Sequence, residues 1–307
     1  MNNSVDFETS FDSAAFQKYI APDCDRLSFL QSYLSGRGVK TSVIPLGDKK
    51  HLYVNFPSSS FNPMFKIKTI ISHYDRVAGS PGANDNSAAN FAIADFASEL
   101  AKSKKVHNVR IIFTDGEELG AEGVSSQGAY ALAELFRKLG ITRDDVYVFD
   151  ACGRGKVAVL CRAGLNSKAS AAFKKNFINL YERTQDILRK AVPNSWMTLP
   201  TPYSDNSGFL ACGIPAVAIT FLPKDEVTFY YNNLMTDRNL EKAVMNSCPD
   251  SSGKSDDLIR KFKYAEKLPK TWRLFHTEYD NFLSLTPNSI KICKNILNSI
   301  AEQLNLC

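Results

Sequence analysis

The sequence predicts an α/β fold in three layers, in which a central mixed, mostly parallel sheet lies between helices. Short apolar runs bounded by Gly, Pro or Asp alternate along the chain with longer segments whose apolar residues recur at helical spacing. Strands that alternate with helices in this way form parallel sheets covered on both faces. The chain has 307 residues, of which 44% are hydrophobic. That is enough for one large domain with a substantial core and no disulfides.

The predicted strands are short apolar or alternating runs that end at a turn residue. They cover residues 51–57, 65–75, 109–115, 145–150, 156–163 and 213–222. The predicted helices carry an apolar face or are rich in Ala and Leu. They cover residues 12–35, with a break near Pro22, and residues 87–104, 126–139, stopped by Gly140, and 168–192. A last helix has Thr286 as its cap and Pro287 at its first position.

One segment does not follow this alternation. Residues 223–270 are polar and hold many of the lysines of the chain. We expect residues 1–307 to form a single domain in which this segment is an insertion over one rim of the sheet. Long structured loops are uncommon unless they are functional, so a lid or pocket wall is one interpretation. A surface insertion without a catalytic role is the other, and the sequence leaves both open.

Composition argues against several classes of partner. The net charge is +5, from 37 basic and 32 acidic residues, and no long basic block is present. We therefore expect neither nucleic acid nor an anionic membrane as a partner. No apolar run approaches the roughly 18 residues that a membrane span needs. The oligomeric state is not readable from the sequence.

Cysteine usage and the start of the chain indicate a compartment. The seven cysteines are scattered and form no C-x-x-C pair, which is typical of reduced thiols. The first residues lack the basic and apolar regions of a secretory signal. We expect a cytoplasmic protein. The sequence leaves open whether a leader was removed before residue 1.

Residues suited to metal chemistry gather where predicted strands end or just after turns. They are His73, Asp75, Asp85, Glu117, Glu118, Asp150, Asp205, His276 and Asp280. In sheets of this kind, functional groups collect at the carboxyl ends of the strands, so distant residues can converge. Two of the four histidines have an aspartate nearby, which is the usual hydrogen-bond partner of a metal-bound imidazole. Each signal alone is common by chance, but the joint pattern predicts a metal site.

In order, these motifs resemble the co-catalytic zinc aminopeptidases of the bacterial leucyl aminopeptidase type. The matching motifs are H-x-D at 73–75, P-G-A-x-D-N at 81–86, G-E-E-x-G at 116–120, the strand ending in Asp150, S-D at 204–205 near G-I-P-A, and H-T-x-x-D at 276–280. They span about two-thirds of the chain. The resemblance implies a zinc-aminopeptidase-like fold and an enzyme that removes the N-terminal residue of peptides.

The resemblance also implies a role for each matching residue. Five residues would bind two zinc ions: His73 and Asp150 one ion, Glu118 and His276 the other, and Asp85 both. Glu117 would be the general base, Asp75 would orient His73, and Asp280 would support His276. Asp205 is a further catalytic candidate. In this family the peptide bond after the bridging aspartate is often cis, which implies a cis bond between Asp85 and Asn86.

The proposed ligand set also makes chemical sense by itself. Five nitrogen and oxygen ligands on two ions leave an open position for water, as a catalytic site requires. Two neighbouring ions acidify that water and stabilise the oxyanion formed when it attacks. Ligands of this kind suit zinc and do not exclude manganese or cobalt.

Glutaminyl cyclases are the main alternative, since they resemble the same family and share H-Y-D, D-G-E-E and H-T-x-x-D with this chain. They bind one zinc ion and close an N-terminal glutamine on itself, with the counterpart of Asp205 assisting. They carry a tryptophan before the last histidine, where this chain has Phe275, and L-G-A-E-G after the glutamates favours the peptidases.

Two other departures from the family motifs and two other possible functions are less informative. Ala89 replaces the glycine that usually follows the bridging aspartate, and Asn206 replaces the histidine of S-D-H. A non-catalytic binding protein would have lost a ligand or the base, and all six positions are intact. Two-domain metallocarboxypeptidases normally insert a dimerisation domain, for which the chain leaves little room.

Overall fold

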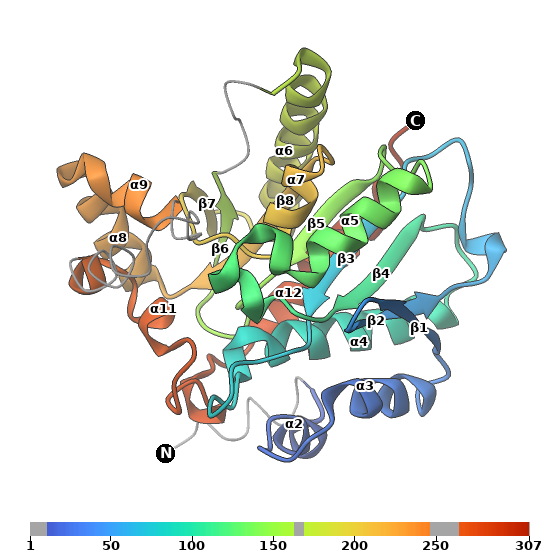
Figure 1. Cartoon of the computed structure of the whole chain (residues 1–307), viewed down its shortest axis with the longest axis horizontal. Coiled ribbons are helices and arrows are strands. Elements are labelled where there is room, and N and C mark those ends of the chain that lie inside the picture. Colours follow the sequence, from blue (N-terminus) through green and yellow to red (C-terminus); the bar gives the residue numbers. More distant parts are fainter. Residues whose placement is uncertain (1–10, 163–168, 246–263, 307) are drawn as a thin grey trace.

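The fold is a mixed sheet of eight described strands between two layers of helices (Figure 1), seen in a computed structural model that describes residues 11–162, 169–245 and 264–306. The strand order is β1-β2-β4-β3-β5-β8-β6-β7. The bounds are β1 Lys40–Leu46, β2 Lys49–Asn55, β3 Lys68–His73, β4 Val109–Thr114, β5 Asp145–Phe149, β6 Val157–Cys161, β7 Trp196–Leu199 and β8 Ala216–Leu222. Strands β4, β3, β5 and β8 pair in parallel, whereas β1, β2 and β6 add antiparallel pairs. The predicted fold class is confirmed.

Helices cover both faces of this sheet. Their bounds are α2 Ser13–Tyr19, α3 Arg26–Ser35, α4 Ala88–Lys102, α5 Gly128–Lys138, α6 Ala171–Ala191, α7 Asn206–Ala211, α8 Lys224–Thr236, α9 Arg238–Met245, α11 Lys270–Leu274 and α12 Ser289–Ala301. Helices α5 and α7 lie in front of the sheet in Figure 1, and α4 and α12 lie behind it. The predicted segment 12–35 is indeed two helices, α2 and α3, separated by a turn that contains Pro22.

Two cores result from this arrangement, because neighbouring side chains of a strand point to opposite faces. In β3, Ile70 packs into the core shared with α4, α6 and α12, and Ile71 packs into the core shared with α5 and α7. Both side chains are fully buried. Central strands are therefore apolar on both faces, which explains why they were readable as continuous apolar runs.

Outside segment 223–270, the elements that the sequence did not predict are short or exposed. Strand β1 lies at the edge of the sheet, contains Pro45, and exposes part of its surface. Strand β7 has four residues and helix α7 has six. Such segments bury too little apolar surface to leave a periodic pattern in the sequence.

The expected start of the last helix is wrong. Helix α12 begins at Ser289, after Asn288 in a left-handed conformation with φ 67°. Thr286 does not cap the helix, because its hydroxyl accepts a hydrogen bond from the backbone N–H of Gly155 at 2.8 Å. The Thr286 N–H donates to the carbonyl of Gly153 at 2.9 Å. This residue therefore joins the loop after β5 to the C-terminal helix.

Most of the described part of segment 223–270 is helical rather than a plain loop. Helices α8 and α9 place Val227, Tyr230 and Leu240 in a third core, which also contains Leu222 of β8 and Trp272 of α11. Residues 246–263 of this segment lie outside the described residues.

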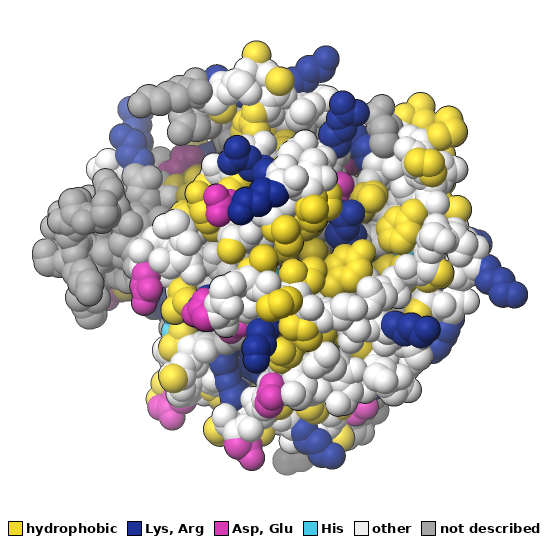
Figure 2. Space-filling view, turned by 45° about the vertical axis from the view of Figure 1, so that its right-hand side comes forward, with side chains coloured by type: hydrophobic (Ala, Val, Ile, Leu, Met, Phe, Trp, Pro, Cys, Tyr) yellow, Lys and Arg dark blue, Asp and Glu magenta, His cyan; other side chains and the backbone are white. Residues whose placement is uncertain are grey.

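The structure also bears on the expectations about cysteines, membrane spans and basic surfaces. None of the five cysteines within the described residues forms a disulfide, and Cys248 and Cys307 lie outside those residues. The helices of the described residues include none with both the length and the apolar character that a bilayer crossing requires. Lys and Arg side chains are scattered over the face shown in Figure 2 rather than gathered into one basic surface.

Candidate metal centre

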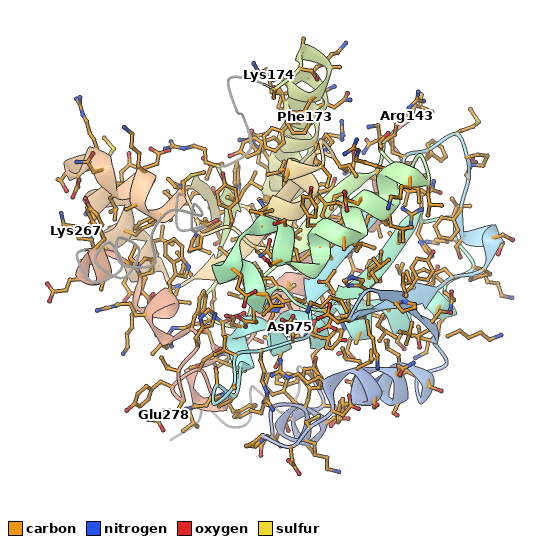
Figure 3. The ribbon with its side chains drawn as sticks, viewed as in Figure 1. Asp75, Arg143, Phe173, Lys174, Lys267 and Glu278 are labelled. Carbon is orange, nitrogen blue, oxygen red and sulfur yellow. The ribbon has the colours of Figure 1, made fainter. Side chains whose placement is uncertain are left out.

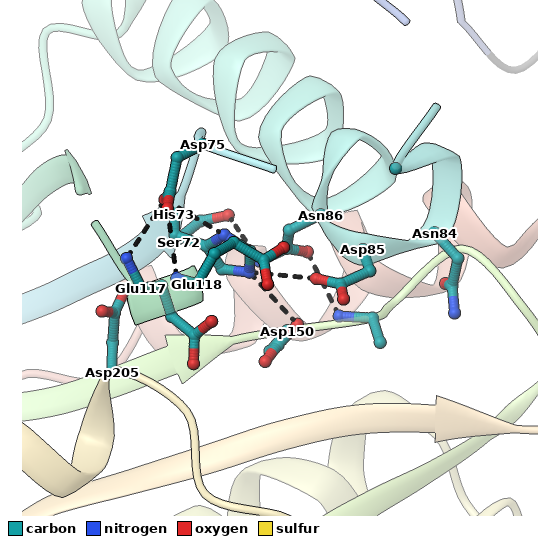
Figure 4. Close-up of polar contacts among 12 residues, drawn as sticks. Ser72, His73, Asp75, Asn84, Asp85, Asn86, Glu117, Glu118, Asp150 and Asp205 are labelled. Atoms are coloured by element: carbon teal, nitrogen blue, oxygen red, sulfur yellow. Dashed lines mark hydrogen bonds and ion pairs between the residues drawn. The ribbon is translucent and has the colours of Figure 1, made fainter. Parts of the chain in front are cut away.

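The residues singled out from the sequence meet at the carboxyl ends of β3, β4 and β5 (Figure 4). The parallel register pairs His73, the last residue of β3, with Thr114, the last residue of β4. Because the strands end at the same edge, the loops that carry Glu117, Glu118 and Asp150 start side by side. Asp85 lies on the turn that leads into α4.

The carboxylate of Asp85 lies between two histidines. Its Oδ1 atom lies 3.1 Å from His73 Nε2, and its Oδ2 atom lies 3.4 Å from His276 Nε2. His73 Nε2 also lies 3.6 Å from Asp150 Oδ1, and His276 Nε2 lies 2.9 Å from Glu118 Oε2. The side chains thus form two groups that could each hold an ion, with ligand atoms within 4.8 Å of one another and with Asp85 in both groups.

The hydrogen bonding of the group around His73 fits a bound cation. His73 Nε2 and Asp150 Oδ1 are buried and make no hydrogen bond among the described residues. Buried polar atoms are normally paired, and carboxylates accept hydrogen bonds but cannot donate them to one another. Imidazole nitrogens with carboxylate oxygens are a donor set that zinc accepts.

The charges of this cluster depend on one another. Burial opposes ionisation of Asp85, but the His276 and His73 imidazoles outweigh it and lower the pKa of the carboxyl group. Contacts with Asp85 and Glu118 raise the pKa of His276 to about 10. In the absence of a metal, protons on the histidines therefore balance the carboxylates. A cation that binds here displaces those protons.

Asp75 lies behind His73 and supports two parts of the site. Its Oδ1 atom lies 3.4 Å from His73 Nδ1, the ring nitrogen that does not face Asp85. Its two oxygens also accept the backbone N–H groups of Glu117 at 3.2 Å and of Glu118 at 3.1 Å. One carboxylate therefore orients the imidazole and fixes the start of the loop that carries both glutamates.

Glu117 belongs to neither of the two groups that share Asp85. Burial of its carboxyl group raises the pKa of Glu117 well above the ordinary value, and the neighbouring His73 only partly opposes the rise. Gln127, which the sequence analysis did not single out, donates from Nε2 to Glu117 Oε1 at 3.2 Å. A glutamine within "GVSSQGA" gives no signal in the sequence, because the contact depends on how α5 packs.

Asp205 lies on the Glu117 side of the site (Figure 4). It is fully buried, and its Oδ2 atom accepts a hydrogen bond from Thr114 Oγ1. Burial raises the pKa of Asp205 to about 7. Its Oδ1 atom makes no hydrogen bond among the described residues. The structure thus brings Asp205 close to the cluster but not into either group of candidate ligands.

The expectation that Asp280 supports His276 is wrong. The carboxylate of Asp280 accepts the backbone N–H groups of Asn84 at 2.8 Å and of Asp85 at 3.0 Å. No hydrogen bond between Asp280 and His276 is present in the described part of the chain. Asp280 therefore holds the turn that carries Asp85, and it joins that turn to the loop that carries His276.

The turn around Asp85 is also joined to the loop after β5. The peptide bond between Asp85 and Asn86 is cis, as the resemblance implies. Asn86 donates to the carbonyl of Phe149 at 2.8 Å and accepts from the Ala151 N–H at 3.1 Å. Asn84 Oδ1 accepts from the Gly153 N–H at 2.7 Å. These bonds fix Asp85 relative to Asp150.

Comparison with known proteins defines the class. Residues 66–301 match the model of peptidase family M28, which covers well over half of the chain. The chain therefore belongs to peptidase family M28. No curated protein matches the sequence.

Solved structures share the fold at low sequence identity. The Legionella pneumophila LapA aminopeptidase has a TM-score of 0.62 and 14% identity, over 97% of this chain and 70% of that one. BSAP, a zinc aminopeptidase from Bacillus subtilis, has a TM-score of 0.51 and 15% identity, over 82% of this chain and 48% of that one. An Acidobacteriales bacterium glutaminyl cyclase has a TM-score of 0.58 and 13% identity, over 94% of this chain and 92% of that one.

Proposed function

We propose that the protein is a zinc aminopeptidase, a hydrolase that removes the N-terminal residue of peptides with two zinc ions. The observation that carries the proposal is the position of Asp85, whose two oxygens face two different histidines. A site for one ion has no need of a carboxylate shared in this way. Membership of peptidase family M28 and the fold shared with BSAP, a zinc aminopeptidase, support the choice of metal and reaction.

Each residue of the site has a distinct proposed role. His73 and Asp150 would hold one ion, Glu118 and His276 would hold the other, and Asp85 would be shared between them. Bound zinc would supply an acidified water molecule and stabilise negative charge on the carbonyl oxygen of the substrate. Glu117 takes the proton of the water and passes it to the departing amine, for which its raised pKa suits it.

A glutaminyl cyclase is the second candidate. The shared D-G-E-E and H-T-x-x-D motifs and the fold of the Acidobacteriales cyclase favour it. Asp205 also favours it, because a buried carboxyl group with a pKa of about 7 beside Glu117 can hold a proton near a reacting amide. Phe275 in the position before His276 argues against it.

A substrate panel on zinc-loaded and chelated protein tests the proposal. We expect the zinc-loaded protein to cleave aminoacyl-p-nitroanilides, to bind close to two zinc ions, and to leave N-terminal glutamine substrates uncyclised. One tightly held zinc ion with cyclisation of glutamine substrates would instead support the cyclase. Two bound ions without turnover of either substrate class would indicate a binding protein.

The variant Glu117→Gln tests the assignment of the base. We expect it to keep the zinc content and to lose turnover by about 10²–10⁴-fold, the usual contribution of a general base. Full activity in this variant would remove Glu117 from the mechanism.

A further inference from the structure

Gln127 lies behind the proposed base and contacts it twice. Its Nε2 atom lies 3.2 Å from Glu117 Oε1 and 3.3 Å from the backbone carbonyl oxygen of Glu117. The Gln127 side chain lies just before α5 and is buried, with 4% of the residue exposed. One amide group therefore holds both the side chain and the backbone of Glu117.

Ser207 of α7 fixes the orientation of this amide. Its Oγ atom lies 2.6 Å from Gln127 Oε1 and 2.8 Å from the carbonyl oxygen of Ser204. A hydroxyl group has one proton, but the Ser204 carbonyl already accepts the Ser207 backbone N–H at 2.9 Å. That carbonyl therefore does not depend on the hydroxyl proton, and the shorter contact, at 2.6 Å, indicates donation to Gln127 Oε1, which leaves Nε2 to face Glu117.

Glu117 lies close enough to other candidate ligands to coordinate an ion itself. An oxygen of Glu117 lies within 4.8 Å of ligand atoms of His73 and Glu118, so these three residues form a further group able to hold an ion. A free glutamate side chain beside a cation becomes a ligand, and a ligand cannot act as a base. Among the described residues, the hydrogen bond that restrains the Glu117 carboxylate is the one from Gln127.

We propose that Gln127 is a positioning residue that holds the Glu117 carboxylate off the metal ions, with Ser207 setting the direction of its amide. The inference rests on the proposed role of Glu117 as the base. Gln127 would touch neither substrate nor metal, so it acts only through the position of Glu117.

The variant Gln127→Met removes the donor and keeps the length and volume of the side chain. We expect kcat to fall by about 10–100-fold, as for a catalytic group displaced by about 1 Å, with KM unchanged. The melting temperature should fall by a few degrees, because buried partners on Glu117 and Ser207 lose their hydrogen bonds. The exposed Gln17 offers a matched control, because Gln17→Met lies on α2 and should leave kcat as in the native chain. An unchanged kcat in Gln127→Met would overturn the proposal.

A spectroscopic test does not depend on turnover. In cobalt-substituted protein, the visible spectrum reports the number and kind of metal ligands. We expect Gln127→Met to change this spectrum, because Glu117 moves onto the metal. In the double variant Gln127→Met/Glu117→Gln the change should disappear, which leaves the spectrum of Glu117→Gln alone. Identical cobalt spectra for the native protein and Gln127→Met would contradict the proposal even if the protein were not a peptidase.

A second variant covers the case in which Gln127→Met does not fold. Ser207→Ala leaves Gln127 in place but removes the donor to its Oε1 atom, so the amide can turn and face Glu117 with its oxygen. We expect a smaller loss of kcat, about 3–10-fold, again without a change in KM. A native kcat and cobalt spectrum in Ser207→Ala would show that the orientation of the amide is irrelevant.

Discussion

Buried carboxylates gather at both ends of the sheet, but they are balanced in different ways. Figure 3 labels Asp75 near the carboxyl end and Arg143, which directly precedes Asp144 and Asp145, near the amino end. At the amino end, Arg183 makes two hydrogen bonds to Asp145, at 2.6 and 3.0 Å. Arg110 pairs with Asp144. Each buried acid there has a permanent cation of the chain beside it.

At the carboxyl end, no Lys or Arg of the described residues forms an ion pair with the acids of the metal centre. The acids of the metal centre face His73 and His276, which carry charge only when protonated, and buried atoms of His73 and Asp150 make no hydrogen bond among the described residues. A buried charge is costly unless it is paired. The comparison indicates that the acids at the amino end have permanent cations as partners, whereas those of the metal centre are balanced by protonated histidines or, as we propose, by bound zinc.

The largest effect should come from removing the shared ligand at the carboxyl end. We expect Asp85→Asn to lower turnover by more than about 10³-fold, because both ions lose a ligand and the charge that attracts them. Metal analysis should show loss of zinc. The metal-free variant should be less stable than the native apoprotein at neutral pH, because the lowered pKa of Asp85 and the raised pKa of His276 show that their contacts stabilise the folded chain. Two zinc ions retained at native affinity would contradict the shared position of Asp85.

At the amino end the matched substitution should act on stability instead. We expect Asp145→Asn to lower the free energy of unfolding by about 3 kcal/mol, because it leaves Arg183 partly buried without its carboxylate. Urea denaturation measures this change. Zinc content and turnover should stay native. Loss of zinc in this variant would show that the two ends are not independent.

A substitution of Asp280 tests whether its hydrogen bonds to the Asp85 turn contribute to metal binding. We expect Asp280→Asn to weaken zinc binding by about 10–100-fold, because one of the two backbone N–H groups of the Asp85 turn then faces an NH2 group instead of an acceptor, while all proposed ligands remain. Competition with a chromophoric chelator measures the affinity. Asp186→Asn is a suitable control, since Asp186 lies exposed on α6. Equal zinc affinity in Asp280→Asn and Asp186→Asn would show that the contacts of Asp280 do not contribute to zinc binding.

The smallest expected effect is the change of zinc affinity with pH. His276 has a pKa of about 10 in the metal-free protein, so it is protonated at neutral pH and must lose that proton to bind zinc. We expect zinc affinity to rise with pH, by up to about tenfold per pH unit for each proton displaced. Calorimetry in buffers of different ionisation enthalpy counts the released protons. A heat of binding that is the same in every buffer would argue against this charge balance.

The sequence predicted the parts of the fold in which apolar burial is periodic. Strands β3, β4, β5 and β8 are buried on both faces, so their runs of apolar residues could be recognised without a structure. The start of α12 was misplaced because Thr286 has the composition of a helix cap but makes its hydrogen bond to another loop. A local pattern cannot show which distant group takes a hydrogen bond.

The same limit applies to the site. The identities and order of the candidate ligand residues could be predicted from the sequence, because metal chemistry requires particular side chains and strand ends place them at one edge. Their division into two groups around Asp85, the contact of Asp280 with the Asp85 turn, and the support of Glu117 by Gln127 were decided only by tertiary packing. Contacts between residues far apart in the chain depend on distances that a sequence does not contain.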